Sequence, residues 1–277
     1  MTSPEKRTDY FDRARETLPW QARRKDFDKR FLELFSLAVH RSRAYQEIYR
    51  SAGVDPSAVR GLEDLERLPV LRMSDLVERQ EKEPPFGGFE TIGSEEIRRI
   101  YINPGLIFQP GERDYADTSW AEALCAAGFR EGDRILNTFN YHLWPLAFML
   151  DASARMIGAT VVPTGVGNTM MQVKILQKLG INGFMGTPSF VMTLVQRAEA
   201  MGLDPRKDLV LEKALVGAEM LPESLRSHLE EKMEMTVQQV YGTVFLGCIG
   251  YECIHKTGLH IPDGLIVEVI DPQTGKH

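Results

Sequence analysis

The sequence predicts an α/β protein whose sheet is mixed but largely parallel and is flanked by helices. From residue 98 onward, short apolar or β-branched runs alternate with helical stretches, a pattern typical of strands joined by crossover helices. Before that point the apolar residues recur at helical spacing. The 277 residues are 43% hydrophobic, so the chain can bury a substantial core. We expect residues 1–96 to form a helical region integral to the domain, and residues 97–277 to form its α/β core.

The helical region divides into a polar arm and a helix-rich part. Residues 1–26 carry Pro4 and Pro19 and predict an arm with a short helix. Apolar side chains at helical spacing then predict a helix over residues 27–52, which stops at Gly53.

The pattern of residues 97–277 predicts seven strands and five helices. The expected strands are residues 98–102, 134–137, 160–163, 183–185, 213–216, 237–241 and 265–270. The expected helices are residues 116–127, 145–157, 169–179, 189–201 and 222–233.

Charge and cysteine content exclude several function classes. The net charge of -6 and the pI of about 5.6 provide no field that would attract nucleic acid. The longest apolar stretch, residues 143–150, is too short to span a bilayer, and residues 1–30 lack the apolar segment of a signal peptide. Three cysteines do not make a disulfide framework. We therefore expect a cytoplasmic protein that has neither nucleic acid nor a membrane as its partner.

The loops after the predicted strands are the place to look for a site, because parallel sheets bind ligands at the carboxyl ends of their strands. Residues 103–111 contain two Gly but no Lys, and two Pro remove possible donors, so by themselves they predict a turn-rich connector. Residues 138–144 gather aromatic side chains, which fits either the wall of an apolar pocket or core packing at the start of a helix.

Four later loops are each a weak indication of a binding site, but the order in which they follow one another along the chain is informative. They read Thr-Gly-Val-Gly-Asn-Thr at residues 164–169, Gly-Thr-Pro-Ser-Phe at 186–190, Gly-Ala-Glu at 217–219 and Tyr-Gly-Thr at 241–243. In the first of these loops two Gly permit close approach of the backbone and Asn168 or Thr169 suits a helix N-cap, and the second loop supplies another N-cap.

This order resembles the adenylate-forming superfamily, and within it the chain is most similar to the phenylacetate-CoA ligase group. The resemblance begins near residue 10 and is also carried by residues 62–76, 121–137, 158–172 and 258–275. Such proteins activate a carboxylic acid with ATP, release pyrophosphate and pass the acyl group to coenzyme A. The resemblance thus implies ATP or AMP, Mg²⁺ and coenzyme A as ligands, and a small-molecule carboxylic acid or nucleotide as partner.

The same resemblance implies two sets of site residues. The residues implied to line the nucleotide pocket, with a tyrosine stacking on adenine, are Gly217, Ala218, Glu219, Tyr241, Gly242 and Thr243. The residues implied to border the acyl or aryl pocket are Phe139, Tyr141, His142, Gly165 and Gly167.

The chain departs from the family pattern in four ways. Thr243 lies one position early for the family's hydroxyl. Residues 103–111 lack the hydroxyl run and the Lys of the family's phosphate loop. Phe245 occupies the position of the carboxylate that would hold Mg²⁺. The chain ends at His277, so we expect an adenylate-forming N-terminal domain that lacks its last subdomain and C-terminal cap.

Three functional hypotheses therefore remain. The chain is a ligase fragment that self-associates or needs a complementing chain, a non-catalytic module that binds an aryl acid or a nucleotide, or a structural assembly partner. The losses within the chain favour the second hypothesis, because a missing terminus does not produce them.

A cluster of cysteine and histidine is a separate candidate. Cys248, Cys253, His255 and His260 fall within thirteen residues, and thiolate and imidazole are the ligands that a structural zinc ion prefers. The alternative is that the cysteines are small buried hydrophobes and the histidines lie on the surface.

Overall fold

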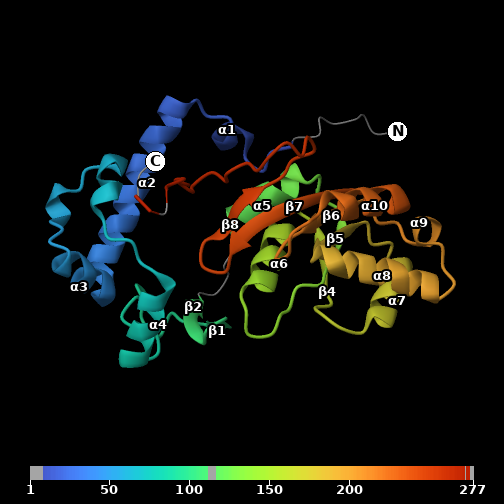
Figure 1. Cartoon of the computed structure of the whole chain (residues 1–277), viewed down its shortest axis with the longest axis horizontal. Helices are drawn as coiled ribbons and strands as arrows, with labels where there is room; N and C mark the ends of the chain where they lie inside the picture. Colours follow the sequence, from blue (N-terminus) through green and yellow to red (C-terminus); the bar gives the residue numbers. More distant parts are fainter. Residues whose placement is uncertain (1–8, 112–116, 272, 275–277) are drawn as a thin grey trace. The chain divides into compact units, whose positions relative to one another are not determined.

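The structure is a computed structural model that describes residues 9–111, 117–271 and 273–274. Its contacts divide the chain into two compact units (Figure 1). One unit comprises residues 17–115, and the other comprises residues 1–16 together with residues 116–277. In this division residues 99–111 group with the helices that precede them, and the boundary expected at residue 97 stays a prediction.

The larger unit is built on a six-stranded sheet with the strand order β4-β3-β5-β6-β7-β8. Strands β3 to β7 pair in parallel, and β8 runs antiparallel to β7 at the edge. The predicted fold class, a mixed and mainly parallel sheet flanked by helices, is thus confirmed. The strands are β3 (Arg134–Asn137), β4 (Thr160–Pro163), β5 (Gly183–Gly186), β6 (Lys213–Val216), β7 (Thr236–Thr243) and β8 (Gly247–Tyr251).

Helices cover both faces of this sheet, and each face has its own apolar core. Along β6, Leu215 belongs to the core that includes residues of α5 and α6, whereas Ala214 and Val216 belong to the core that includes residues of α7, α8 and α10. Successive side chains of a strand point to opposite faces, so β6, which is buried on both sides from Ala214 to Val216, is apolar over those residues. The helices of the unit are α1 (Arg13–Glu16), α5 (Thr118–Ala126), α6 (Leu146–Met156), α7 (Thr169–Leu179), α8 (Pro188–Ala200), α9 (Pro205–Asp208) and α10 (Glu223–Met233).

Local sequence explains where these helices begin and end. Asn168 caps α7 by accepting a hydrogen bond from the Met171 backbone N–H at 3.2 Å, and Gly180 closes the helix with a left-handed φ of 54°. Thr187 caps α8, and Pro188 follows it at the first helical position, where no intrahelical donor is needed. The five predicted helices of this unit are all present, with ends displaced by no more than two residues.

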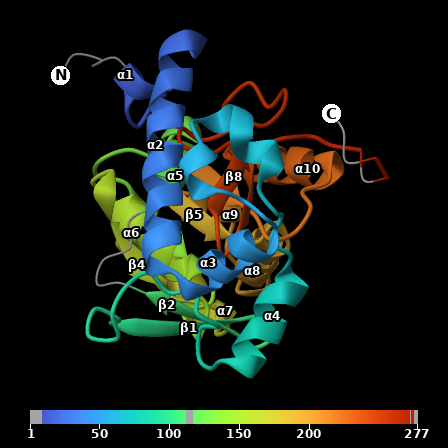
Figure 2. The same ribbon diagram turned by 90° about the vertical axis from the view of Figure 1, so that its left-hand side faces the viewer.

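The smaller unit contains helices and one hairpin (Figure 2). Its hairpin contacts α4, because the Gln80 side chain exchanges two hydrogen bonds with the Phe108 backbone at 2.7 and 2.8 Å. Its elements are α2 (Trp20–Arg41), α3 (Arg43–Ser51), the 3₁₀ helices η1 (Pro56–Ala58) and η2 (Leu62–Arg67), α4 (Met73–Lys82), β1 (Arg99–Asn103) and β2 (Ile107–Gly111). None of the helices in the described residues is both long and apolar enough to cross a membrane.

Several sequence predictions need correction. The helix expected over residues 27–52 starts earlier and is broken at Ser42, whose hydroxyl caps α3 and donates to the Gly88 carbonyl at 2.8 Å. Residues 107–111 form β2 rather than part of a connector, because they pair with β1. Strand β8 was not predicted.

The strand expected at residues 265–270 does not form. A strand needs a neighbour for its backbone hydrogen bonds, and among the described residues no strand is paired with this segment. Ile266, Val267, Val269 and Ile270 are exposed as a result.

Candidate functional site

The carboxyl edge of the sheet brings the predicted site loops together. The loops after β3, β4, β5 and β6 and the end of β7 all lie at this edge, because the five strands run in parallel (Figure 1). The predicted loops therefore lie at one edge of the sheet, and their role as a binding site stays a prediction.

Gly186, at the end of β5, joins the two predicted sets. Its carbonyl accepts a hydrogen bond from the Gly217 backbone N–H at 3.1 Å. On the other side, a Cβ at position 186 would lie 2.1 Å from Oγ1 of Thr138, the residue after β3. Only glycine allows so close an approach, so the β3 and β6 loops are held against the same strand end.

The residues implied for the nucleotide lie on neighbouring strands. Val216 pairs with Gln239 in register, which places Gly217 level with Val240. A Cβ at Gly217 would lie 3.0 Å from both Cγ1 and the carbonyl oxygen of Val240, so the two strands are closely packed there. Ala218 has a left-handed φ of 64°.

The side chains of this set face outward to different degrees. Glu219 is exposed, and its Oε2 accepts a hydrogen bond from the Ser189 N–H at 3.4 Å, at the start of α8. The Tyr241 side chain is 59% exposed, so a face of its ring is available for stacking. Gly242 leaves room for Trp120, whose ring would lie 2.9 Å from a Cβ there, and Thr243 accepts from the Leu246 N–H at 3.1 Å.

The residues implied for the acyl pocket are brought together in part. The Gly165 N–H donates to the Asn137 carbonyl at 3.1 Å, which ties the β4 loop to the end of β3. A Cβ at Gly165 would lie 3.8 Å from the Phe139 carbonyl oxygen and 3.9 Å from Cδ2 of Tyr141. The Gly165 backbone therefore lies beside the Phe139 carbonyl and the Tyr141 ring, whereas the Phe139 side chain is buried in the core.

The Tyr141 hydroxyl is engaged on both sides. It donates to Oδ2 of Asp151 at 3.0 Å and accepts from Nδ2 of Asn137 at 2.8 Å. Asp151 in turn accepts from Nε of Arg155 at 2.7 Å. Burial, together with the neighbouring Asp151 carboxylate, raises the pKa of the Tyr141 phenol well above its usual range, so the hydroxyl stays protonated.

The other two residues of this set lie apart from these contacts. His142 is exposed, and its backbone N–H donates to Asn140 Oδ1 while its carbonyl accepts from the Trp144 N–H, each at 2.8 Å. Gly167 has a φ of 89°, and nothing lies within 4 Å of where its Cβ would be, so it serves the turn into α7.

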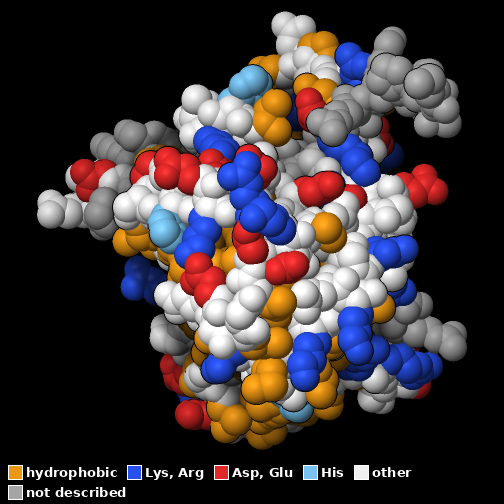
Figure 3. All heavy atoms as spheres, turned by 90° about the vertical axis from the view of Figure 1, so that its right-hand side faces the viewer, with side chains coloured by type: hydrophobic (Ala, Val, Ile, Leu, Met, Phe, Trp, Pro, Cys, Tyr) orange, Lys and Arg blue, Asp and Glu red, His pale blue; other side chains and the backbone are white. Residues whose placement is uncertain are grey.

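Exposed apolar side chains gather beside these loops. They come from the β3 and β4 loops and the start of α7, and they are Leu143, Trp144, Val166, Met170 and Met171. Figure 3 shows one face of the molecule on which apolar side chains gather at the lower end, the end where Figure 1 places the loop before α6.

Sequence reasoning missed three residues that support the loops. Asn137 and Asp151 hold Tyr141 as described, and Gln172 donates from Nε2 to the Gly165 carbonyl at 2.9 Å. Gln172 is 3% exposed, and its Oε1 has no hydrogen-bond partner among the described residues. The available signal was the polar character of these residues within otherwise apolar stretches.

The residues present do not fit a magnesium site of the family type. Val244, Phe245 and Leu246 form the turn between β7 and β8, and none of them offers a carboxylate. In the β1–β2 hairpin, residues 103–111 offer no lysine. No step of the chemistry is therefore assigned to a metal ion held at these positions.

The cysteine and histidine cluster is not assembled as a ligand set. Cys248 is 1% exposed inside the core, where burial raises the pKa of its thiol and so disfavours the thiolate that a metal would bind. The His260 ring stacks on Tyr251, with the ring centroids 5.6 Å apart. Within the described residues no three His, Cys, Asp or Glu side chains are grouped to hold a metal ion. Zinc at these residues stays a prediction, which elemental analysis tests.

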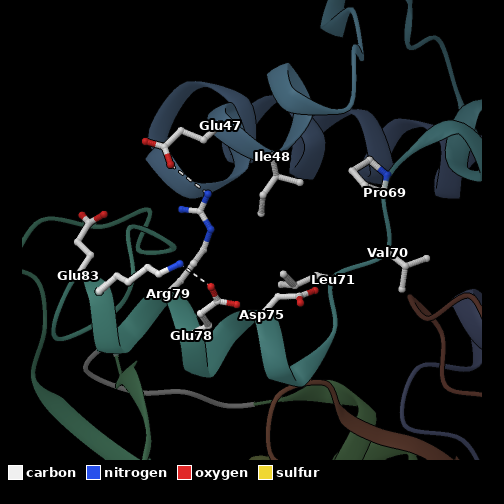
Figure 4. Close-up of a pocket in the computed structure, with 10 residues that line it drawn as sticks. Glu47, Ile48, Pro69, Val70, Leu71, Asp75, Glu78, Arg79 and Glu83 are labelled. Carbon is white, nitrogen blue, oxygen red and sulfur yellow. Dashed lines mark hydrogen bonds and ion pairs between the residues drawn. The ribbon is translucent and has the colours of Figure 1, made fainter.

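The smaller unit has a hollow of its own, of about 490 Å³, lined by charged residues of α3 and α4 and by residues 69–71 (Figure 4). Arg79 reaches across it to Glu47 at 3.0 Å, and Lys82 pairs with Glu78. Glu83 pairs with Arg43. Because these charges satisfy one another, the hollow lacks the convergent free polar groups that mark a ligand site.

Comparison with known proteins supports the resemblance. No family model matches the chain. It is 32% identical over 272 residues to the phenylacetate-coenzyme A ligase of Thermus thermophilus, covering 94% of this chain and 60% of that protein. It is 30% identical over 243 residues to the enzyme of the same name from Pseudomonas putida, covering 84% of this chain and 54% of that protein. The chain thus spans between about half and three-fifths of the length of these relatives.

Solved structures agree in fold. A 2-hydroxyisobutyryl-CoA ligase in complex with 2-HIB-AMP and CoA superposes in an open conformation with a TM-score of 0.82 at 24% identity, covering 91% of this chain and 57% of that one. In its thioesterification state the TM-score is 0.84 at 22% identity, covering 99% of this chain and 61% of that one. Over most of its length this chain is thus similar in sequence to phenylacetate-coenzyme A ligases, and it shares the fold of the solved 2-hydroxyisobutyryl-CoA ligase.

Proposed function

We propose that the carboxyl edge of this sheet binds a small carboxylic acid beside an adenine nucleotide, as part of an acid–CoA ligase-like protein. The observation that carries the proposal is the position of Gly186. It contacts Thr138 on the acid side and Gly217 on the nucleotide side, so an acyl group and an adenosine phosphate bound there would be adjacent.

The relatives support this choice of ligands. The solved ligase with the same fold holds 2-HIB-AMP and CoA, and the curated relatives are named phenylacetate-coenzyme A ligases. By this proposal Tyr241 stacks on adenine, Gly217 lets the backbone approach the nucleotide, and Tyr141 with Phe139 borders the acyl group. Coenzyme A would be the acceptor of the acyl group in a complete cycle.

We further infer that this chain by itself binds without efficient turnover. Adenylation concentrates negative charge on phosphate oxygens, and catalysis requires cations or donors aimed at that charge. Phe245 offers no ligand for Mg²⁺, and residues 103–111 offer no lysine. Losing such stabilisation costs on the order of several kcal/mol in the barrier, which is a rate loss of several powers of ten.

Two measurements on the whole chain test the proposal. Isothermal titration with AMP, ATP, coenzyme A and phenylacetate measures binding, and a coupled pyrophosphate assay with ATP, Mg²⁺ and phenylacetate measures turnover. We expect saturable binding of AMP and phenylacetate, with pyrophosphate release at background. Failure of both to bind would overturn the proposed site, and release at ordinary ligase rates would overturn the inferred loss of turnover.

Assembly is the second candidate function, favoured by the exposed apolar side chains of residues 265–270. In such an assembly, either a second copy of this chain or a different, complementing chain would cover residues 265–270. Light scattering across a concentration series separates the two forms: self-association raises the mass with concentration, whereas a complementing chain leaves the isolated protein monomeric.

A further inference from the structure

The Tyr141 side chain is held from three directions within the larger unit. Its hydroxyl lies between Oδ2 of Asp151 and Nδ2 of Asn137, at 3.0 and 2.8 Å. The edge of its ring meets Phe148, with the ring centroids 5.2 Å apart at an interplanar angle of 85°. Such an aromatic side chain is fixed in position before any ligand arrives.

The two residues that hold the hydroxyl are themselves anchored. Asn137 is fully buried at the end of β3, where its Nδ2 also donates to the Ala147 carbonyl at 3.0 Å and its Oδ1 accepts from the Phe139 N–H at 3.2 Å. The side chain of Asp151 is 19% exposed, and its second oxygen pairs with Arg155. Neither residue can turn away without leaving a buried polar group unsatisfied, which costs about 1–3 kcal/mol.

The engaged hydroxyl determines which atoms of Tyr141 a bound acid can contact. A phenol has one O–H to donate, and the Tyr141 O–H is already donated to the Asp151 carboxylate, while the phenol oxygen accepts a hydrogen bond from Asn137. Toward the Gly165 loop the tyrosine presents ring carbon, since Cδ2 is the atom nearest the position of a Gly165 Cβ. A polar substituent on a bound acid would meet carbon rather than a free hydroxyl.

We infer that Asp151 and Asn137 are positioning residues that withhold the Tyr141 hydroxyl from the ligand, so that the pocket selects acids with an unsubstituted apolar or aromatic body over their hydroxylated analogues. This inference rests on the proposed function, since it concerns the acid side of the same site. Beyond the proposed function, Asp151 and Asn137 set the selectivity, and its direction is against hydroxylated acids.

The test compares three acids on the whole chain by isothermal titration: phenylacetate, mandelate and 4-hydroxyphenylacetate. The wild-type protein is expected to bind phenylacetate more tightly than both hydroxylated acids. Asp151→Ala frees the phenol proton, and we expect it to shift the affinity ratio toward at least one hydroxylated acid by about 5-fold, the size of one net hydrogen bond.

Two variants control for a merely structural role. Asp151→Asn still offers an oxygen that accepts from Tyr141, so the wild-type ratio should return. Tyr141→Phe removes the hydroxyl itself, so adding Asp151→Ala to Tyr141→Phe should no longer shift the affinity ratio. AMP titration of each variant shows whether the fold and the nucleotide side are intact.

The failures are distinguishable. Wild-type protein that binds none of the acids overturns the acid site of the proposed function, and this inference with it. If phenylacetate binds but Asp151→Ala leaves both ratios unchanged, or Asp151→Ala still shifts a ratio in the Tyr141→Phe background, this inference alone is overturned. If Asp151→Ala also loses AMP binding, the shift must appear in Asp151→Ser, and its absence there equally overturns the inference.

Discussion

Arg226 and Glu252 form a two-point ion pair in the interior of the larger unit. Nη1 and Nη2 of Arg226 lie 2.8 Å from Oε2 and Oε1 of Glu252, and each side chain is 6% exposed. Arg226 also donates to the Val237 carbonyl at 2.7 Å, and Glu252 accepts from the Gln239 N–H at 2.8 Å. The pair thus ties α10 to β7 and to the segment that follows β8.

Removing one partner of this pair should destabilise the protein. Arg226→Met leaves the Glu252 carboxylate buried without its cation, and the free energy of unfolding should fall by about 3–5 kcal/mol. Urea unfolding measures it. The double variant Arg226→Met with Glu252→Leu removes both charges and should recover much of the loss. A loss below about 1 kcal/mol for Arg226→Met would contradict this account.

Glu122 should make stability depend on pH. Burial raises the pKa of its carboxyl from 4.5 to about 8; the carboxylates of Glu16, Asp263 and Asp117 add to the increase, and the Asp263 backbone N–H opposes it. The folded protein then holds a proton that the unfolded chain releases from about pH 4.5 upward. The contribution of the buried Glu122 proton to the free energy of unfolding is therefore full below pH 4.5. It falls as the pH rises toward 8 and changes no further above that pH.

Glu122→Gln tests this pH dependence. The amide is neutral at every pH and still accepts the 2.8 Å hydrogen bond from the Asp263 N–H. We expect the variant to show a flatter pH profile between 5 and 8 and to be more stable than the wild type at pH 8, on the order of a few kcal/mol. Glu81→Gln, at an exposed position, is the control and should leave the profile unchanged. Parallel profiles for wild type and Glu122→Gln would show that Glu122 titrates normally.

Tyr241 should contribute to nucleotide binding through its ring alone. Stacking of a base on an aromatic side chain is worth about 1–3 kcal/mol, so Tyr241→Ala should weaken AMP binding by at least about 5-fold. Tyr241→Phe keeps the ring and should bind like the wild type. Because Tyr241 is 59% exposed, neither variant should change the unfolding midpoint appreciably. Equal AMP affinity in all three proteins would remove Tyr241 from the nucleotide site.

The sequence predicted the parallel part of the fold well because its signals are local. Helix α7 was placed at residues 169–179 as observed, since Asn168 and Gly180 mark its ends and apolar residues repeat between them. Strands β3, β4 and β6 also match residue for residue, because they are short apolar runs bounded by charged residues, glycine or proline. Strand β8 was not predicted because Gly247 and Gly250 interrupt its apolar run.

The candidate site was predictable only as a set of loops. The two glycines of residues 164–169 signalled close backbone approach, and Gly165 has a left-handed φ of 62°. The close approaches at Gly186 and Gly217 were not predicted. The partners of Tyr141 were not predictable: Asp151 lies ten residues away on α6, and Asn137 reads as the last residue of a strand. Nothing in residue spacing indicates which side chain will accept a hydrogen bond from the phenol O–H.

What the sequence alone determined is the succession of strands and helices in the larger unit and, through the resemblance of its loops, the relatedness to phenylacetate-CoA ligases. Both depend on residues that are close along the chain. Tertiary structure decided the strand order β4-β3-β5-β6-β7-β8, the Arg226–Glu252 pair, the burial that raises the pKa of Glu122, and the clamp on the Tyr141 hydroxyl. These depend on contacts between segments far apart in sequence, where a change of one residue in register turns a side chain from one face of the sheet to the other.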